Sequence, residues 1–431
     1  MLATIPAFPM RLSLSFLHLN PVLAASAPPG GLLGWSSPVR ADRPRSRRRA
    51  RGLALLALPI VGVLGIWSAI RVFPGFGPAL ADGLRATIGS EAVTALEELS
   101  AEAEDRLRLA VDRSGARGLS DVTPEEVVAL SRQAPAEPAP GIAAAPAFRP
   151  RDVGPLFPAV ASPEDGQWQP VPVAIGEGEP LHRTLVHPDP KRPYAELFVF
   201  ALDLSRVKLH FVPGSREPKG LPGAQAALPR PGRVPEGELG ALIAAFNGGF
   251  KSEHGQFGMQ ANGVEIAPPK PGSCTVAASA DGALRIGTWS SLRAQSSSFT
   301  DWRQTPACMV ENGALHPGLT GDSTRWGATI DGDTVIRRSA VGLDRERRTL
   351  FVAISNATTA RALATGMMHV GAHDVAQLDV NHSYPRFVLY RHDGAEGVTA
   401  MTAVKGFSVD RDAYVGRASP RDFFYVTARP G

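Results

Sequence analysis

Cysteine is scarce in this sequence: the 431 residues include only Cys274 and Cys308. Neither belongs to a CxxC pair, and their spacing excludes a zinc site of the usual kind. Two cysteines in one domain can form a single disulfide if the domain lies in an oxidising compartment. Two buried free thiols are the alternative.

Several catalytic signatures are also absent. The chain has no P-loop, no HExxH pair and no motif that marks a Ser-His-Asp catalytic triad. No GxGxxG follows a strand with an acidic residue downstream, so a nucleotide-binding oxidoreductase has no support.

Positive charge is concentrated in one short arm. Between residues 40 and 51 the chain carries seven arginines and one acid, Asp42. This arm contributes +6, which leaves −2 for the rest of a chain whose formal net charge is +4. The part that can fold is therefore not basic, and we expect no nucleic-acid partner.

A long uncharged run follows the arginine arm. Residues 52–70 read GLALLALPIVGVLGIWSAI, and about 20 such residues span a bilayer. The arginines before the run place the N-terminus in the cytoplasm by the positive-inside rule. The sequence thus predicts a single-pass membrane protein: a cytoplasmic segment at 1–51, a transmembrane signal anchor at 52–70 and a periplasmic or extracellular C-terminal domain. Cleavage of a signal peptide near Ala79-Leu80-Ala81 is the alternative.

A predicted helical segment and then an Ala/Pro-rich linker separate this predicted anchor from the folded domain. Apolar residues recur at helical intervals from about residue 80, and Glu102 and Glu104 stand four residues before Arg106 and Arg108. We expect a juxtamembrane helical stalk at 79–133, acting as a simple spacer or, alternatively, self-associating. Ala/Pro-rich sequence cannot pack a core, so we expect a linker at 134–165 and the folded domain at 166–431.

The rest of the chain alternates strand-like runs with turn residues. One helix is expected at about 358–370. The pattern predicts an α+β (mixed α/β) fold that is rich in strands, with one or two packed helices. Strands are expected at 196–202, 207–212, 239–246, 273–278, 284–289, 334–343, 349–354, 375–380 and 386–390.

Four stretches carry a family resemblance: LFVFALDLSRVKLHFVPG with Asp203, AAFNGGFKSEHGQFG at 244–258, IRRSAVGLD at 336–344 and AQLDVNHSYPRF at 376–387. In this order they resemble the motifs of the phosphodiester glycosidase family, which implies that family's fold and hydrolysis of a sugar phosphodiester. Better-known members read LDGGGSS where this chain has LDVNHS. The last motif is similar to that of a bacterial, membrane-anchored subgroup, which reads LD(I/V)N before an aromatic residue.

The motifs contain side chains suited to the implied chemistry. Asp379 follows an apolar run at a strand end and is a candidate general base, nucleophile or cation ligand. His382 and His254 can transfer protons near neutral pH. For each of these residues a solvated loop or turn position is the alternative. Substrate contacts are expected from backbone N–H groups and side chains that donate to phosphate or sugar oxygens: Asn247, Gly248, Gly249, Arg338 and Asn381. For Asn247-Gly248-Gly249 the alternative is a tight turn, and for Arg338 it is an ordinary charge on a strand surface.

Two functions fit this pattern. The first is a membrane-anchored extracytoplasmic hydrolase that acts on a carbohydrate or glycosyl-phosphate substrate, with no certain cofactor and Ca²⁺ a possible ligand near Asn381. The second is a non-catalytic envelope module that binds polysaccharide or protein on the same fold. Convergence of Asn247, Arg338 and Asp379 on one cavity would favour the enzyme, and their dispersal would count against it.

Overall fold

The computed structural model describes residues 76–114 and 148–429, apart from 174, 176–177, 220, 222–224, 226–228, 321–325, 327–333, 382, 395–396 and 408. The predicted cytoplasmic segment 1–51, the predicted anchor at 52–70 and most of the predicted linker lie outside these residues. Within them, no helix combines the length and apolar character needed to cross a bilayer.

Two helices come first in the described chain. They are α2 (Phe76–Ile88) and α3 (Ser90–Arg113), and Gly89 between them has a positive φ of 86°, which favours glycine. Both expected ion pairs form on α3: Arg106 contacts Glu102, and Arg108 Nη2 lies 2.7 Å from Glu104. The described part of the predicted stalk is therefore helical, in two pieces.

The domain is built on three antiparallel sheets. Sheet A has the order β1 (Gln169–Pro170), β2 (Leu181–Val186), β3 (Leu197–Asp203), β14 (Thr349–Thr358), β13 (Ile336–Leu343), β15 (Asp374–Val380), β11 (Val310–Glu311) and β12 (Ala314–Leu315). Sheet B has the order β17 (Val398–Thr402), β16 (Phe387–His392), β5 (Leu242–Asn247), β18 (Phe423–Ala428) and β4 (Val207–Val212). Sheet C has the order β7 (Val264–Ala267), β6 (Met259–Ala261), β10 (Phe299–Thr305), β8 (Cys274–Ser279) and β9 (Leu284–Thr288).

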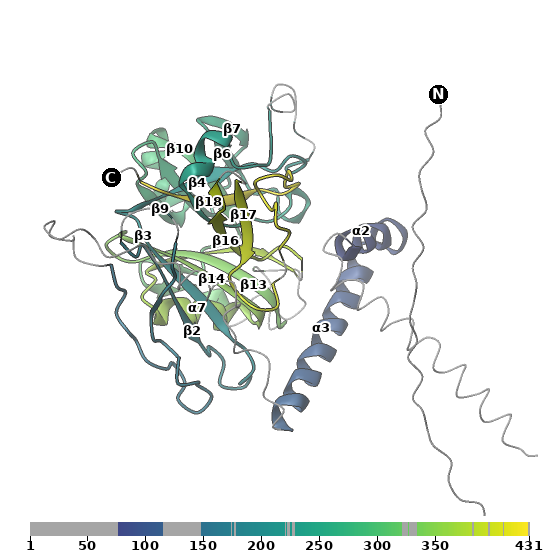
Figure 1. Ribbon diagram of the computed structural model, residues 1–431. Coiled ribbons are helices and arrows are strands. Elements are labelled where there is room, and N and C mark those ends of the chain that lie inside the picture. Colours follow the sequence, from purple (N-terminus) through teal and green to yellow (C-terminus); the bar gives the residue numbers. More distant parts are fainter. Residues whose placement is uncertain are drawn as a thin grey trace, which may run out of the picture. The chain divides into compact units, whose positions relative to one another are not determined.

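One helix covers an outer face of sheet A. Helix α7 (Ala360–His369) packs against β3, β13 and β14 (Figure 1). It begins where the hydroxyl of Thr359 accepts a hydrogen bond from the Ala362 N–H at 3.1 Å, which caps the helix. A Cβ at Gly366 would lie 2.5 Å from Leu197 Cδ2, so the missing side chain lets α7 approach β3 closely.

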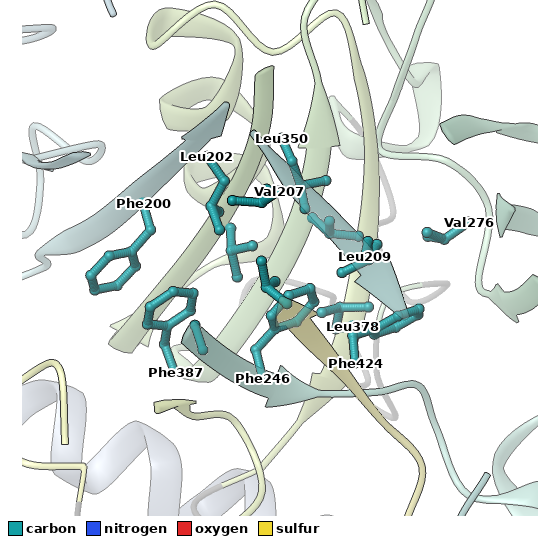
Figure 2. Packing of buried hydrophobic residues seen from close by; sticks show 14 of the residues in the cluster. Phe200, Leu202, Val207, Leu209, Phe246, Val276, Leu350, Leu378, Phe387 and Phe424 are labelled. Atoms are coloured by element: carbon teal, nitrogen blue, oxygen red, sulfur yellow. The ribbon is translucent and has the colours of Figure 1, made fainter. Parts of the chain in front are cut away.

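The main core lies where the three sheets face one another. Figure 2 shows side chains from β3, β5 and β16 in contact there, with Phe200 stacked on Phe387 at a centroid distance of 3.9 Å. Phe246 of β5 stacks in turn on Phe424 of β18, at 5.3 Å. Burying each such ring stabilises the fold by about 1.5–3 kcal/mol. The strand-rich α+β fold predicted from the sequence is confirmed.

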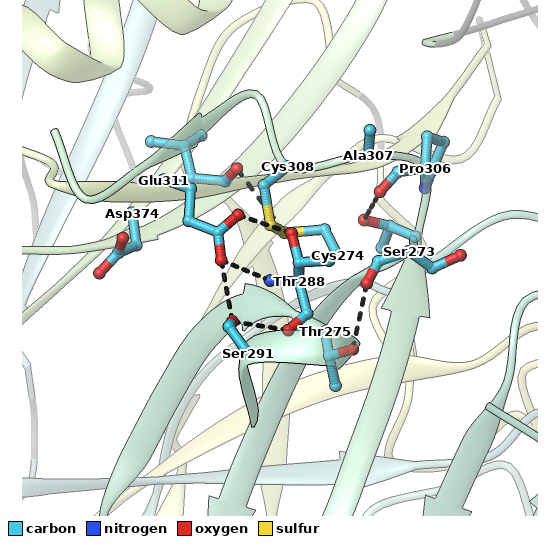
Figure 3. Close-up of a disulfide and its surroundings, with 12 residues drawn as sticks. Ser273, Cys274, Thr275, Thr288, Ser291, Pro306, Ala307, Cys308, Glu311 and Asp374 are labelled. Atoms are coloured by element: carbon cyan, nitrogen blue, oxygen red, sulfur yellow. Dashed lines mark hydrogen bonds between the residues drawn. A yellow bond between two sulfur atoms is a disulfide. The ribbon is translucent and has the colours of Figure 1, made fainter. Parts of the chain in front are cut away.

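The single predicted disulfide is present. Cys274 of β8 is bonded to Cys308, which precedes β11, so the bond joins sheet C to sheet A (Figure 3). Close to it, both carboxylate oxygens of Glu311 accept hydrogen bonds from Thr288, at 2.8 Å from its N–H and 2.6 Å from its hydroxyl. No cysteine remains free.

The folded domain begins earlier than its expected start at residue 166. Trp168 N–H donates to Asp152 Oδ1 at 2.9 Å, and Asp165 accepts the N–H of His187 at 2.8 Å. Apolar side chains in this stretch, among them Leu156, pack against the cluster beneath α7. Because apolar residues resume after the Ala/Pro spacer, the chain from residue 148 onward is part of the domain.

Candidate functional site

The candidate site lies where strands of sheets A and B end together. Strand β5 ends at Asn247, opposite Phe423 at the start of β18. Strand β15 ends one residue after Asp379, and the Asp379 N–H donates to the Gly248 carbonyl at 3.0 Å. The NGG turn, the LDVN motif and the start of β18 thus meet at one place.

A bulge positions Asp379 on its strand. Arg338 of β13 pairs with Val380, whereas Ala340 pairs with Gln377, so β15 has one extra residue between these pairs. Such a bulge interrupts the ladder and re-aims side chains. The hydroxyl of Ser339, between the two pairs, donates to the Asp379 carbonyl at 3.1 Å.

Asp379 is buried beside a cation. Its Oδ2 accepts a hydrogen bond from Arg421 Nη2 at 2.7 Å, and Asn381 Nδ2 approaches the same oxygen at 3.3 Å. Only 3% of Asp379 is exposed. Burial raises the pKa of the Asp379 carboxyl, although the attraction of Arg421 acts to lower it. A carboxyl with a raised pKa is suited to exchange protons closer to neutral pH.

Arg421 has one buried donor without a partner. Its Nη2 donates both to Asp379 and to the Gly249 carbonyl, the latter at 2.8 Å. Its guanidinium lies over the Tyr384 ring, 4.4 Å from the centroid. Its Nε is buried with no hydrogen-bond partner among the described residues. An unpaired buried N–H costs about 1–3 kcal/mol, so this donor is a local strain on the fold.

The charge on Arg421 is maintained by its neighbours. Burial works against the charged form, but the attraction of Asp379, followed by that of Asp422, raises the pKa of the guanidinium. The site therefore holds a permanent cation in contact with a carboxyl.

A second buried ion pair lies next to the first. Arg303 Nε donates to Asp422 Oδ2 at 2.8 Å, and neither side chain is more than 2% exposed. The same oxygen accepts the Gly249 N–H at 2.8 Å, and the Asp422 carbonyl accepts the Gly248 N–H at 3.0 Å. The anion bound by the glycine turn is thus the protein's own Asp422. A Cβ at Gly248 would lie 2.1 Å from Asp422 Oδ2, so only glycine fits there.

The two asparagines organise the turns around this pair. Asn247 Nδ2 donates to Ser339 Oγ at 2.9 Å, and its Oδ1 accepts the Arg386 N–H at 3.1 Å, so it ties β5 to β13 and to the chain before β16. Asn381 Oδ1 accepts the N–H groups of Ser383 and Tyr384, each at 2.8 Å. This Asx turn sets the Tyr384 ring against Arg421.

Arg338 is not brought to the Asp379–Arg421 pair. It is 1% exposed, and burial lowers the pKa of its guanidinium to about 9. Among the described residues, its nitrogens donate to neutral acceptors: the carbonyls of Trp326, Thr334 and Thr358, and Gln377 Oε1. Its neighbour Ser339 is the β13 side chain that reaches the site.

The turn after the glycines carries the remaining predicted residue. His254 ends the short helix η2 (Ser252–His254), and its Nε2 lies 3.8 Å from Glu253 Oε1. Burial lowers the pKa of His254, and Arg421 is among the cations whose repulsion adds to this. Buried Glu217 accepts the N–H and hydroxyl of Ser252 at 3.1 and 2.8 Å, which anchors η2. His382 lies outside the described residues.

The predicted residues that converge are Asp379, Asn381, Asn247, Gly248 and Gly249. Arg421, Asp422, Arg303, Tyr384 and Glu217 were not predicted. A signal for two of them exists, because Arg421-Asp422 directly precedes the apolar run of β18. Among the described residues, no three His, Cys, Asp or Glu side chains are grouped to hold a metal ion.

The region that carries Asn247 and Asp379 is also the region that matches a known protein family. The phosphodiester glycosidase family model matches residues 240–379, from two residues before β5 to Asp379, which confirms the resemblance to that family. No curated protein matches.

Two solved structures are similar at low identity. The first is the zebrafish N-acetylglucosamine-1-phosphodiester α-N-acetylglucosaminidase catalytic domain, auto-inhibited by its pro-peptide. The similarity covers 61% of the present chain and 88% of the zebrafish chain, at 14% identity and a TM-score of 0.38. The second is a hypothetical protein from Synechocystis, and the similarity covers 58% of the present chain and 63% of the Synechocystis chain, at 11% identity and a TM-score of 0.36.

Proposed function

We propose that this chain, which has a phosphodiester glycosidase-like domain, hydrolyses a sugar phosphodiester or a related envelope glycan at a site centred on Asp379 and Arg421. The family match at 240–379 supports a glycosidase-like domain. The observation that carries the proposal is the buried pair itself: a carboxyl with a raised pKa, 2.7 Å from a cation that retains an unpaired donor. The substrate class is a carbohydrate or glycosyl phosphate.

The chemistry needs one base and one cation. Water attacks the anomeric carbon, the bond from that carbon to the phosphate oxygen breaks, and its electron pair leaves with the phosphate. Asp379 is placed to take the proton from the water. Arg421 is placed to bind the phosphate and to stabilise the charge that gathers on the leaving oxygen. The two side chains are in direct contact, 2.7 Å apart, so the sugar phosphate would bind beside the pair and not between its members.

We further propose that the domain is extracytoplasmic and anchored by residues 52–70. The seven arginines between 40 and 51 and the uncharged run after them support this orientation. The Cys274–Cys308 disulfide supports it independently, because disulfides persist mainly in oxidising compartments.

A non-catalytic envelope module is the second candidate, and one observation favours it. The Asn247 amide and the N–H groups of Gly248 and Gly249 are all engaged in internal hydrogen bonds. The motif that was expected to bind a ligand therefore contributes mainly to the local fold. On this alternative, Arg421 would bind an anionic glycan without cleaving it.

Hydrolysis assays on the full-length protein separate the two candidates. The panel contains chromogenic and phosphate-linked GlcNAc substrates, with wild type, Asp379→Asn and the control Asp393→Asn, whose carboxylate pairs with Arg391 in the β16–β17 hairpin. We expect turnover by wild type and control, and a loss of about 100-fold in Asp379→Asn. Glycan binding without turnover by wild type would contradict the enzyme and support the module.

A further inference from the structure

Helix α3 exposes its apolar side. Leu96, Leu99 and Leu107 are 52%, 62% and 60% exposed, and Val111 is 45% exposed. Residues three and four positions apart share a helix face, so these side chains form one stripe, together with the exposed alanines Ala92, Ala103 and Ala110. A soluble helix normally turns such a stripe towards a partner.

The opposite side of α3 is the polar one, and it has partners. Asp105 accepts a hydrogen bond from Arg192 Nε at 3.1 Å and another from the Tyr194 hydroxyl. The Arg108 guanidinium lies 5.8 Å from the centre of the Tyr194 ring. The loop before β3 thus engages the charged face of α3, and the apolar stripe is left for something else.

The charge of α3 argues against a lipid surface as the occupant. The helix contains seven acidic residues and three arginines, a net charge of −4. Helices that lie in the membrane interface are typically rich in Lys and Arg on their polar face, and anionic headgroups repel a negative helix. A protein surface fits this stripe better than a bilayer does.

The ends of the stripe are complementary to one another. The midpoint of α3 lies between residues 101 and 102, and Leu96 and Leu107 are equally far from it, as are Ala92 and Val111. An antiparallel second copy therefore sets each Leu96 against a Leu107 and each Ala92 against a Val111. The same symmetry sets Glu97 beside Arg106, a pair of opposite charge, while within one copy Glu97 pairs with Arg85 and Arg106 with Glu102. It sets Leu99 against Glu104, which pairs with Arg108 in its own copy.

We propose that α3 is a homodimerisation helix, which pairs antiparallel with α3 of a second copy through Leu96, Leu99 and Leu107. Burying each leucine contributes on the order of 1 kcal/mol or more. If both copies are anchored in one membrane, their high effective concentration makes even a small interface sufficient.

Mass measurement tests the interface. Light scattering of the purified full-length chain in detergent, corrected for bound detergent, should give twice the 45.5 kDa chain mass. Leu99→Asp/Leu107→Asp should give the monomer, while Thr94→Asp, with a charge on the opposite side of α3, should remain dimeric. Equal unfolding temperatures of the domain show that the variants fold. A monomeric wild type, or a dimeric double aspartate variant, would overturn the proposal.

Cross-linking tests the orientation. Because the two native cysteines are bonded to each other, introduced cysteines are the reactive thiols. Leu96→Cys/Leu107→Cys should oxidise to a covalent dimer, whereas Leu96→Cys and Leu107→Cys alone should not. Covalent dimers from either single variant would instead indicate parallel helices and would overturn the antiparallel pairing.

Discussion

Arg421 and Asp422 are consecutive in the chain, yet each belongs to a different buried ion pair, the first with Asp379 and the second with Arg303. Arg303 also donates to the carbonyls of Phe250 and Gln304, at 2.6 and 2.7 Å, so its pair is embedded in backbone hydrogen bonds. Arg421, in contrast, keeps an unpaired Nε. The Arg303–Asp422 pair supports the fold, and the Asp379–Arg421 pair is the one that retains an unpaired donor.

The Arg303–Asp422 pair should dominate local stability. Asp422→Ala leaves the Arg303 cation and the Gly249 N–H without their acceptor, so we predict a loss of about 3–5 kcal/mol in the free energy of unfolding. Urea denaturation measures it. The double variant Arg303→Met/Asp422→Ala should lose less than the sum of the single changes, because no unpaired cation remains. Additive losses would show that the two side chains are not coupled.

The disulfide should contribute strongly to stability. Cys274 and Cys308 are 34 residues apart, and closing a loop of that length stabilises a fold by about 4 kcal/mol in the chain-entropy model. We predict that Cys274→Ala/Cys308→Ala lowers the urea midpoint accordingly. Thiol titration of the unfolded, unreduced wild type should find no reactive thiol. Two titratable thiols would contradict the bond.

His210 should make the domain sensitive to acid. Its ring stacks on Tyr425 and its Nε2 lies 2.9 Å from Thr427 Oγ1. Burial, together with the repulsion of Lys208 and Arg429, lowers its pKa from 6.5 to about 4. The unfolded chain therefore takes up the proton first as the pH falls. The stabilisation is complete above pH 6.5 and is lost between pH 6.5 and about 4.

The stabilisation that depends on His210 is about 2 kcal/mol, once solvent screening of this partly exposed ring is allowed for. The unfolding free energies of wild type and His210→Gln, measured at pH 7 and pH 4.5, give the value. Wild type should lose more stability than the variant between the two pH values. An equal loss in both proteins would rule out His210 as a source of the acid sensitivity.

The regular elements could be predicted because their signals are local. The expected strands at 207–212 and 284–289 agree with β4 and β9 to within a residue, and the expected helix at 358–370 contains α7. Strand β18, with the run FFYVTA, has the same local signal and was not predicted. The sheet order could not be predicted, since it depends on contacts between distant parts of the chain.

The site was predictable where motifs mark strand ends and unpredictable where a bulge intervenes. Asn247 ends β5 and Asp379 is the next-to-last residue of β15, and the two turns meet as expected. Arg338 was assigned to the site because a cation in a motif suggests phosphate binding. One extra residue in β15 shifts the register there, and the adjacent Ser339 is the side chain that reaches Asp379. The cation beside Asp379 is instead Arg421, which is 42 residues further along the chain than Asp379.

The most direct measurement of the central claim is the kcat/KM of Arg421→Lys, for a phosphate-linked sugar and for an uncharged aryl glycoside of the same sugar. Lysine keeps the positive charge but lacks the planar donors of the guanidinium. We predict a fall of about 100-fold for the phosphodiester and a much smaller fall for the uncharged glycoside. The free energy of unfolding is measured in parallel to confirm that the variant is folded. An unchanged kcat/KM for the phosphodiester in a folded Arg421→Lys protein would contradict the assignment of the Asp379–Arg421 pair as the reactive centre.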